Sequence, residues 1–217
     1  MPEKAIETIG EFGLISEIRK WFPKGPDVLL GIGDDAALLR TNKTCHQLVT
    51  VDTIVEGVDF DLKKATAARL GHKALAINLS DIAAMGGIPK FAVVSLVLPT
   101  KTSIRFVRDF CRAMSKLARR FGVSVVGGDL SRGPKIICSV TALGEIKSGH
   151  AVLRNNARAN DLIGVTGTLG GSIFSKHLNF TPRVREGELL ASAGVSAMID
   201  ISDGLIQDLY HLVEGKK

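Results

Sequence analysis

The stretch TAARLGHKALAINLSDIAAMGGIPKFAVVSLVLP, residues 66–99, sets the architecture of this chain. Its first part follows a helical period with small apolar side chains throughout, which predicts a largely buried helix over residues 66–85. The pair Gly86-Gly87 and the nearby Pro89 mark the end of that helix. The FAVVSLVLP segment that follows predicts a strand, so a buried helix and a strand are neighbours along the chain.

Helices and strands continue to alternate on both sides of this stretch. A first helix is expected around GEFGLISEIRKWF, ending at Pro23, and QLVTVDTIV, residues 47–55, predicts a strand because it is rich in β-branched residues. Residues 101–120 predict another helix, and SVVGGD and KIICSVTALGEI predict two further strands. This order predicts a layered α/β domain of sheet and helices over residues 1–148.

A second unit is expected over residues 149–217. After the polar segment GHAVLRNNARAND comes the apolar LIGVTGTLGG, and TPRVREGELLASAG then predicts a helix. SAMID predicts a short strand, and ISDGLIQDLYHLVEG predicts a helix with Ser202 as its N-cap. These elements are too few to close a domain, so we expect an incomplete α+β second domain; the sequence leaves open whether the natural chain continues past Lys217.

The composition is that of a folded protein. Among the 217 residues, 45% are hydrophobic and 23% are charged. We found no apolar run of the roughly 18 residues that a membrane span requires, and the acidic start MPEKAIETIGEFG differs from a signal peptide. A cytoplasmic protein without membrane contact is therefore expected. The three scattered cysteines, Cys45, Cys111 and Cys138, predict buried thiols rather than a disulfide framework or a CxxC metal site.

Positive charge is concentrated on one predicted helix. The net charge is +6, and basic side chains recur at helical spacing within residues 101–120, opposite an apolar stripe. The basic positions are Arg105, Arg108, Arg112, Lys116 and Arg119, and the apolar ones are Val107, Phe110, Met114 and Leu117. No aromatic stacking platform accompanies the basic face, so a solvated surface is favoured over nucleic-acid binding.

Aspartates recur inside or at the ends of apolar elements. Five segments show the pattern: GIGDDAAL, VTVDTIV, NLSDIAAM, VVGGDLS and MIDISDGL. A buried carboxylate costs several kcal/mol unless it is paired or binds a metal. Helix capping or turn chemistry explains any one of these residues by itself, whereas five such segments together favour a shared site.

A shared site of this kind predicts magnesium and phosphoryl transfer. The aspartates that would converge are Asp35, Asp52, Asp81, Asp129, Asp200 and Asp203. Their oxygens suit a hard cation such as Mg²⁺, and the neighbouring glycines allow phosphate groups to approach the backbone. The histidines show no zinc-site spacing. The sequence also lacks a GxxxxGK[ST] loop and the HRD and DFG motifs, so the common nucleotide-binding loops do not explain the pattern.

The motifs resemble a known family over essentially the whole chain. GEFGLI, GIGDDAALL, VDTIVEGVDF, ALAINLSDIAAMGGIPK, GGDLSRGP, VTGTLGGS, TPRV and MIDISDGL occur in the order and spacing of the thiamine-monophosphate kinases. That family belongs to the superfamily of aminoimidazole ribotide synthetase and selenophosphate synthetase. The resemblance implies transfer of the ATP γ-phosphoryl group to thiamine monophosphate, with several Mg²⁺ ions. It also implies a homodimer whose N-terminal domains join through their strands, and family members are longer, so most of the second domain is missing.

The resemblance also assigns roles to residues by position. It implies catalysis by Asp35, Asp52, Asp81 and Asp129 through bound Mg²⁺, with Thr50, Asp200, Asp203 and the backbone of Val51 as further metal contacts. It implies ATP contacts from Gly128, Asp129, Arg154 and Ser202.

Several positions depart from the family pattern. Asp59 replaces a histidine beside the substrate, and Val51 replaces a hydroxyl residue. Asn156 stands where glycine is usual, and Gly171 where aspartate is usual. An aspartate at position 59 would repel a phosphate. The sequence therefore leaves two alternatives open: a related enzyme with another acceptor, and a nucleotide-binding module without turnover.

Overall fold

A six-stranded sheet forms the middle of the molecule. The computed structural model describes residues 8–174 and 176–213. The strand order is β1-β2-β3-β6-β4-β5, and all neighbouring pairs are antiparallel except β4 and β5. The strands are β1 (Val28–Leu30), β2 (Ala37–Arg40), β3 (Cys45–Val55), β4 (Ile88–Leu98), β5 (Ser124–Arg132) and β6 (Ile137–Lys147).

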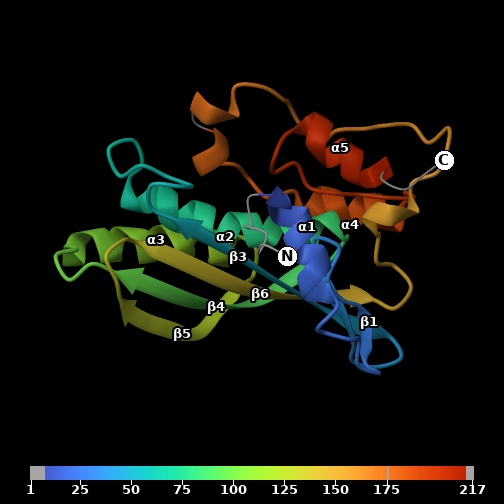
Figure 1. Cartoon of the computed structure of the whole chain (residues 1–217), viewed down its shortest axis with the longest axis horizontal. Coiled ribbons are helices and arrows are strands. Elements are labelled where there is room, and N and C mark those ends of the chain that lie inside the picture. Colours follow the sequence, from blue (N-terminus) through green and yellow to red (C-terminus); the bar gives the residue numbers. More distant parts are fainter. Residues whose placement is uncertain (1–7, 175, 214–217) are drawn as a thin grey trace.

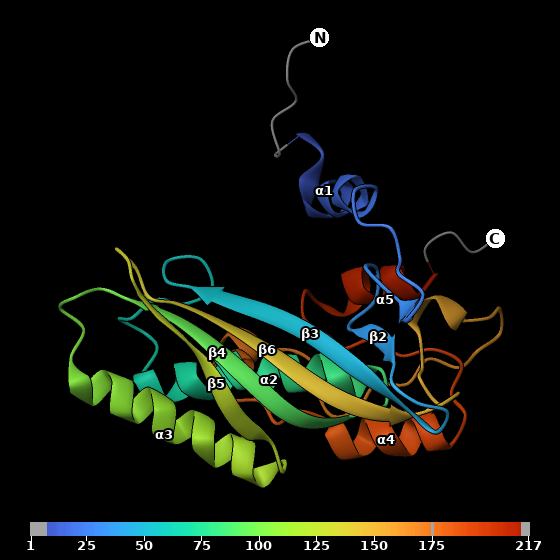
Figure 2. The same cartoon turned by 90° about the horizontal axis from the view of Figure 1, so that it is seen from below.

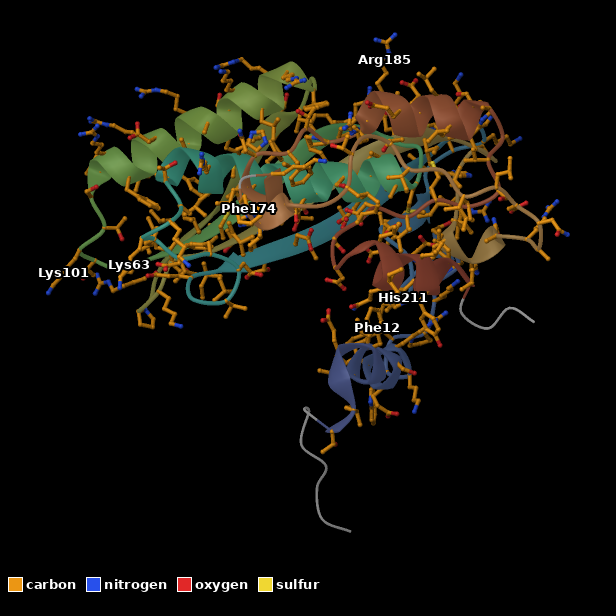
Figure 3. The ribbon with its side chains drawn as sticks, turned by 90° about the horizontal axis from the view of Figure 1, so that it is seen from above. Phe12, Lys63, Lys101, Phe174, Arg185 and His211 are labelled. Atoms are coloured by element: carbon orange, nitrogen blue, oxygen red, sulfur yellow. The ribbon has the colours of Figure 1, made fainter. Side chains whose placement is uncertain are left out.

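Helices cover one face of this sheet. Figures 1 and 2 show α2, α3 and α4 on the same side of the sheet, and α1 and α5 contact none of the described strands. Helix α1 projects from the body in Figures 2 and 3. The helices are α1 (Gly10–Arg19), α2 (Ala67–Ala84), α3 (Ile104–Arg120), α4 (Val184–Ser192) and α5 (Leu205–Val213), with 3-10 turns η2 (Arg154–Asn156), η3 (Ser172–Phe174) and η4 (Lys176–Leu178).

Helix α2 lies at the centre of the helical layer. Thr66 caps its start, with Oγ1 accepting the N–H of Arg69 at 3.4 Å. The chain leaves the helix at Gly86, whose φ of +78° is a conformation that favours glycine. Gly71 lets α3 come close, because a Cβ at this position would lie 2.1 Å from the carbonyl oxygen of Phe110. The small side chains of α2 therefore allow two helices and the sheet to pack around it.

The core lies between this helical layer and the covered face of the sheet. Alternate side chains of β3 point into it, so His46, Leu48 and Ile54 are buried, whereas Val51 is exposed on the open face. Larger buried side chains around α2 include Leu75, Leu79, Ile82, Phe110 and Val140.

Most predicted elements are confirmed. The helices expected at the N-terminus and around residues 66–85, 101–120 and 184–192 are present. Strand β4 is longer than predicted and begins at Ile88, before the FAVVSLVLP segment. Of the three cysteines, only Cys138 is buried, whereas Cys45 is half-buried and Cys111 is exposed on α3.

Two predictions for the last third of the chain are wrong. Residues 196–200 form no strand, because no described strand lies beside them to pair with. Ser202 is not the N-cap of α5, since the helix begins at Leu205. The carboxylate of Asp208 instead accepts the N–H groups of Ser202 and Gly204, at 3.1 and 3.0 Å.

The boundary between the two predicted units stays a prediction. Leu178 and Val184, beyond residue 148, contribute to the same core as α2 and α3. Gly187 of α4 contacts α2 closely, since a Cβ there would lie 2.2 Å from the carbonyl oxygen of Ala83. In the described part of the chain, no helix has the length and apolar character to cross a bilayer.

Candidate functional site

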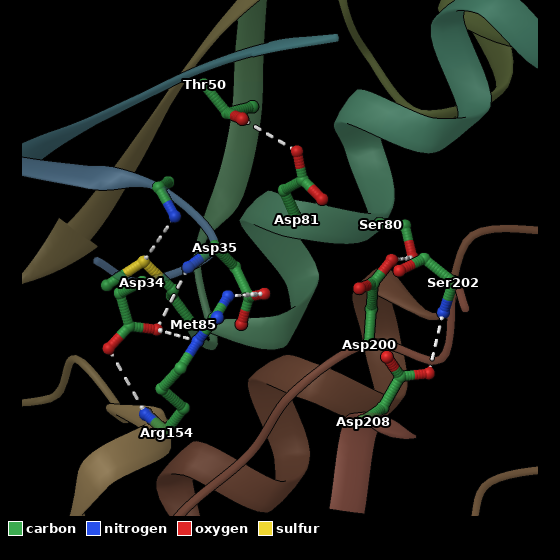
Figure 4. A network of polar contacts seen from close by, with 11 residues as sticks. Asp34, Asp35, Thr50, Ser80, Asp81, Met85, Arg154, Asp200, Ser202 and Asp208 are labelled. Atoms are coloured by element: carbon green, nitrogen blue, oxygen red, sulfur yellow. Dashed lines mark hydrogen bonds and ion pairs between the residues drawn. The ribbon is translucent and has the colours of Figure 1, made fainter. Parts of the chain in front are cut away.

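Four aspartates from four separate segments lie close together. We call Asp35, Asp52, Asp81 and Asp200 the acidic cluster. Asp35 follows β1, Asp52 lies on β3, Asp81 on α2, and Asp200 in the loop before α5. The negative charges of Asp35, Asp52 and Asp200 all raise the pKa of Asp81, which places the four carboxylates within electrostatic reach of one another. Figure 4 shows Asp35, Asp81 and Asp200 around the end of α2.

Burial is the main cause of the raised pKa values in this cluster. It raises the pKa of Asp35 to about 7, although Arg154 lowers it and the charges of Asp200 and Asp34 raise it further. The Nη2 atom of Arg154 lies only 2.5 Å from Asp35 Oδ1, yet burial is the larger effect, and the charge of Asp34, which shares the same guanidinium, adds to it. The negative charge of Asp35 is therefore only partly compensated by the protein.

The other three carboxylates are shifted in the same direction. Burial, followed by the charges of Asp200 and Asp59, raises the pKa of Asp52 to about 6, and Lys73 opposes the shift. Burial also raises the pKa of Asp81 well above its usual range and that of Asp200 above its usual range. The cluster thus holds an excess of negative charge that a cation would stabilise.

Polar neighbours fix the orientation of these carboxylates. Thr50 Oγ1 donates to Asp81 Oδ2 at 2.6 Å, and Ser80 Oγ donates to Asp200 Oδ2 at 2.8 Å (Figure 4). The fully buried Asn78 accepts the backbone N–H of Asp52 at 3.1 Å and donates to the carbonyl oxygen of Ala74 at 3.0 Å. Residues 78–81 of α2, about one helical turn, therefore position three members of the cluster.

The donor set fits divalent cations such as Mg²⁺. Asp35 Oδ2 is buried without a hydrogen-bond partner among the described residues, so it has a free acceptor facing the protein interior. No group of three or more His, Cys, Asp and Glu side chains in residues 8–174 and 176–213 is arranged to hold one metal ion. Protein-bound Mg²⁺ commonly uses one or two carboxylates, with waters and substrate phosphates as its other ligands. Cations shared between pairs of these carboxylates and a phosphate match that chemistry.

Asp129 lies apart from the acidic cluster. Asp52 of β3 is in register with Val140, Val94 and Gly128 across the sheet, on the face covered by helices. Asp129 is one residue further along β5 and therefore faces the open side, where Ser131 Oγ donates to its Oδ2 at 2.8 Å. Its predicted metal and ATP contacts stay predictions.

The backbone of Val51 is directed away from the cluster. A trans peptide points its carbonyl opposite to the next N–H, and the N–H of Asp52 points to Asn78. The Val51 carbonyl therefore points toward β6, where Val51 is paired with Thr141. Gly128 packs against β4, since a Cβ there would lie 1.8 Å from the carbonyl oxygen of Val94.

The residues before α5 border the cluster. Asp203 is exposed, its Oδ2 accepts from Gln207 Nε2 at 3.0 Å, and its charge helps to raise the pKa of Asp200. Ser202 lies between these two aspartates in sequence, with its N–H held by Asp208. Asp203 and Ser202 therefore lie next to the cluster, and the metal and ATP contacts that the resemblance implies for them stay predictions.

Asp59 has a structural partner as well as a charge near the cluster. Its Oδ2 accepts the N–H of Val55 at 2.7 Å, which closes the loop after β3. Its charge also contributes to the raised pKa of Asp52. The position predicted to border the substrate therefore lies near the cluster and adds negative charge there.

Sequence reasoning assigned no role to Asn78, Ser80 or Asp208. Asn78 and Asp81 are three residues apart in the mainly apolar second half of the helix, so the pairing of Asn78 with an aspartate on one face was a signal that the sequence offered. Asp208 is almost completely buried, but its spacing of four residues from Gly204 became meaningful only once the helix start was known.

Known proteins share this fold and these sequence features. The family model for "AIR synthase related protein, N-terminal domain" matches residues 33–146. The thiamine-monophosphate kinase of Bacillus subtilis is 37% identical over 94% of this chain and 70% of its own length. The structure of AaThiL complexed with AMPPCP and TMP aligns with a TM-score of 0.85 and 30% identity, over 99% of this chain and 72% of that one. The thiamine monophosphate kinase from Aquifex aeolicus aligns with a TM-score of 0.81 and 31% identity, over 97% and 73%.

The sheet with its one-sided helical layer and acidic cluster defines a protein of the AIR synthase related class. Within that class, the family is decided by the sequence identity to thiamine-monophosphate kinases and by the share of the chain over which it extends. The chain belongs to the thiamine-monophosphate kinase family, and it spans about 70% of the length of its relative from Bacillus subtilis.

Proposed function

We propose that this chain is a thiamine-monophosphate kinase, which transfers the γ-phosphoryl group of ATP to thiamine monophosphate and yields thiamine diphosphate and ADP. The observation that carries the proposal is the acidic cluster: four partly buried carboxylates with raised pKa values, next to Arg154, in a chain of this family. The complex of AaThiL with AMPPCP and TMP supports the same pair of substrates.

The residues of the site suit a reaction without a strong general base. The acceptor oxygen belongs to a phosphate group that is already ionised near neutral pH, so positioning and charge neutralisation suffice. Bound Mg²⁺ would neutralise phosphate charge between the two substrates. Asp35, Asp52 and Asp81 would hold it; Thr50 keeps Asp81 oriented, and Ser80 keeps Asp200 oriented.

Arg154 is a cation of the described part of the chain that is placed to meet a phosphate group. Its side chain is 19% exposed, and its guanidinium lies beside the cluster. A planar fork of N–H donors matches phosphate oxygens and fixes their orientation. Gly128, Asp129 and Ser202 are the other ATP contacts that the resemblance implies, although Asp129 faces the open side of the sheet.

We further propose that the protein is a homodimer joined through the open face of the sheet. That face exposes Val51 (59%) and Phe91 (46%), an apolar surface suited to association. Asp129 faces the same side, so it would lie at the interface between the two protomers. Light scattering should give a mass twice that of one chain. The Phe91→Lys variant should have the mass of a single chain. A natural chain that stays monomeric at micromolar concentration would contradict the dimer.

A transfer assay tests the kinase. Purified protein with ATP and Mg²⁺ should convert thiamine monophosphate to thiamine diphosphate, measured by chromatography of the products. Asp81→Asn should lower the rate by about 100-fold or more, since it removes a charge that would hold Mg²⁺. The folded state should persist, because the amide keeps an acceptor for Thr50. Asp27→Asn, at an exposed position beside Arg40, is the matched control. Unreacted thiamine monophosphate with the natural chain would refute the proposed reaction.

Asp59 favours a second candidate, a related kinase with another acceptor. Its carboxylate adds negative charge close to Asp52, where the family has a histidine. ADP release from a set of phosphorylated and unphosphorylated acceptors separates the two candidates. Turnover of another compound while thiamine monophosphate stays unreacted would establish the second candidate.

The cytoplasmic localisation stays a prediction.

A further inference from the structure

Asp34 is a buried carboxylate to which neither the family resemblance nor the proposed reaction assigns a role. It precedes Asp35 in the loop between β1 and β2, and its side chain is only 3% exposed. A carboxylate without partners at such a position would cost free energy of folding, so the groups that pair with Asp34 indicate its role.

The Asp34 carboxylate connects two distant segments. Its Oδ1 accepts the N–H of Asp35 at 3.0 Å, and its Oδ2 accepts the backbone N–H of Arg154 at 3.2 Å. Oδ1 also lies 3.4 Å from Arg154 Nε, an ion-pair distance without hydrogen-bond geometry. One side chain therefore holds both the backbone and the guanidinium of Arg154 beside the loop that carries Asp35 (Figure 4).

This attachment restricts the Arg154 side chain and leaves part of it available. Nη2 donates to Asp35 Oδ1 at 2.5 Å. Nη1 has no hydrogen-bond partner among the described residues, whereas a guanidinium offers five N–H donors in one plane. A fork held at Nε and Nη2 loses little further freedom when its remaining edge meets an anion.

Two carboxylates facing one guanidinium also keep the local charge negative. If Asp35 alone were paired with Arg154, that ion pair would be neutral. Because Asp34 shares the guanidinium, Asp35 keeps negative charge, and its Oδ2 has no partner among the described residues. The same three residues can therefore meet a phosphate on one side and a cation on the other.

We propose that Asp34 is a positioning residue that fixes Arg154 against Asp35, so that Arg154 meets a phosphate group of the nucleotide while Asp35 Oδ2 stays open to a cation. The inference rests on the proposed function, since a phosphate-bearing ligand is what Arg154 would bind. It predicts effects on nucleotide binding as well as on the rate of phosphoryl transfer.

The variant Asp34→Asn tests the proposal. The amide keeps the size of the side chain but loses the charge and one acceptor oxygen. Affinity for Mg-AMPPCP, measured by calorimetry, should fall on the order of 10- to 100-fold, as expected for a lost buried contact to a charged group. Binding of Mn²⁺ alone, followed by electron paramagnetic resonance, should fall by only about two- to threefold, because Asp34 is not proposed as a ligand and acts on the cation indirectly, through the pair of Arg154 and Asp35. Asp27→Asn, at an exposed carboxylate, should change neither value.

A double-mutant cycle ties the effect to Arg154. Arg154→Gln should weaken Mg-AMPPCP binding by a similar factor, and the double variant should bind no more weakly than the weaker single variant. If Asp34→Asn does not fold, Arg154→Lys tests the same contact, because an ammonium group cannot bridge Asp34 and Asp35 as a fork. Its Mg-AMPPCP affinity should fall on the order of tenfold, and natural affinity would overturn the proposal.

Three results with Asp34→Asn would overturn the positioning role. They are natural affinity for Mg-AMPPCP, additive losses in the cycle with Arg154, and a parallel loss of Mn²⁺ affinity that makes Asp34 a metal ligand. If the natural chain binds Mg-AMPPCP without phosphorylating thiamine monophosphate, only the proposed function fails. If it does not bind Mg-AMPPCP at all, both proposals fail.

Discussion

Without divalent cations, the chain should lose stability as the pH rises from 5 to 8. The acidic cluster is the reason, because its carboxylates have higher pKa values in the folded chain than in the unfolded chain. A group of this kind contributes stability that is fully present below its unfolded pKa and is lost as the pH rises through its folded pKa. The ordinary pKa of an aspartate is 3.8, and that of Asp35 in the folded chain is about 7, so the loss of stability due to this residue is complete near pH 7.

The size of the effect follows from the shift of this one residue. Between pH 5 and a folded pKa of about 7, two pKa units correspond to about 3 kcal/mol of unfolding free energy. The Asp35 side chain is 5% exposed, so solvent screens little of this energy. Asp52, with a folded pKa of about 6, adds to the same trend.

Urea unfolding followed by circular dichroism checks the prediction. The free energy of unfolding is measured between pH 5 and pH 8 with a chelator, and then with Mg²⁺. Added Mg²⁺ should stabilise the chain more at pH 8 than at pH 5, since protonated carboxylates bind it poorly. Asp35→Asn is the matched variant: it should remove the part of the pH dependence due to Asp35, so its unfolding free energy should fall less over the same range.

Two results would refute this reasoning. One is an unfolding free energy that stays constant or rises from pH 5 to pH 8 without divalent cations. The other is an Asp35→Asn variant with the full pH dependence of the natural chain. Either result would mean that burial does not make the carboxylates costly, so the electrostatic basis for cation binding would be lost.

Three further changes test the packing and the site. Gly71→Ala should destabilise the fold by about 2–4 kcal/mol in urea unfolding, because its Cβ would lie 2.1 Å from the carbonyl oxygen of Phe110; an unchanged midpoint would show that α3 shifts freely. Asn78→Ala should cost about 1–3 kcal/mol, because the N–H of Asp52 loses its acceptor; an unchanged unfolding free energy would argue against that contact. Asp59→His should lower the KM for thiamine monophosphate, and an unchanged KM in steady-state assays would separate this position from the substrate.

The local structure of this chain is largely readable from its sequence. Helical periodicity and turn residues located α2 and α3, because these signals act over a few neighbouring residues. The same reasoning predicted a strand in residues 196–200. The composition of this segment is typical of a strand, but no described strand lies beside it to pair with. A strand requires a second strand, and no local pattern records where one lies.

The sequence by itself determined that carboxylates would gather, since aspartates repeated within apolar segments need common compensation. Only the tertiary structure decided which of them meet. Strand register puts Asp52 on the covered face and Asp129 on the open one, a difference of one residue that no composition reveals. It also gave Asp34 its partner, Arg154, because a contact across 120 residues depends on how the whole chain folds.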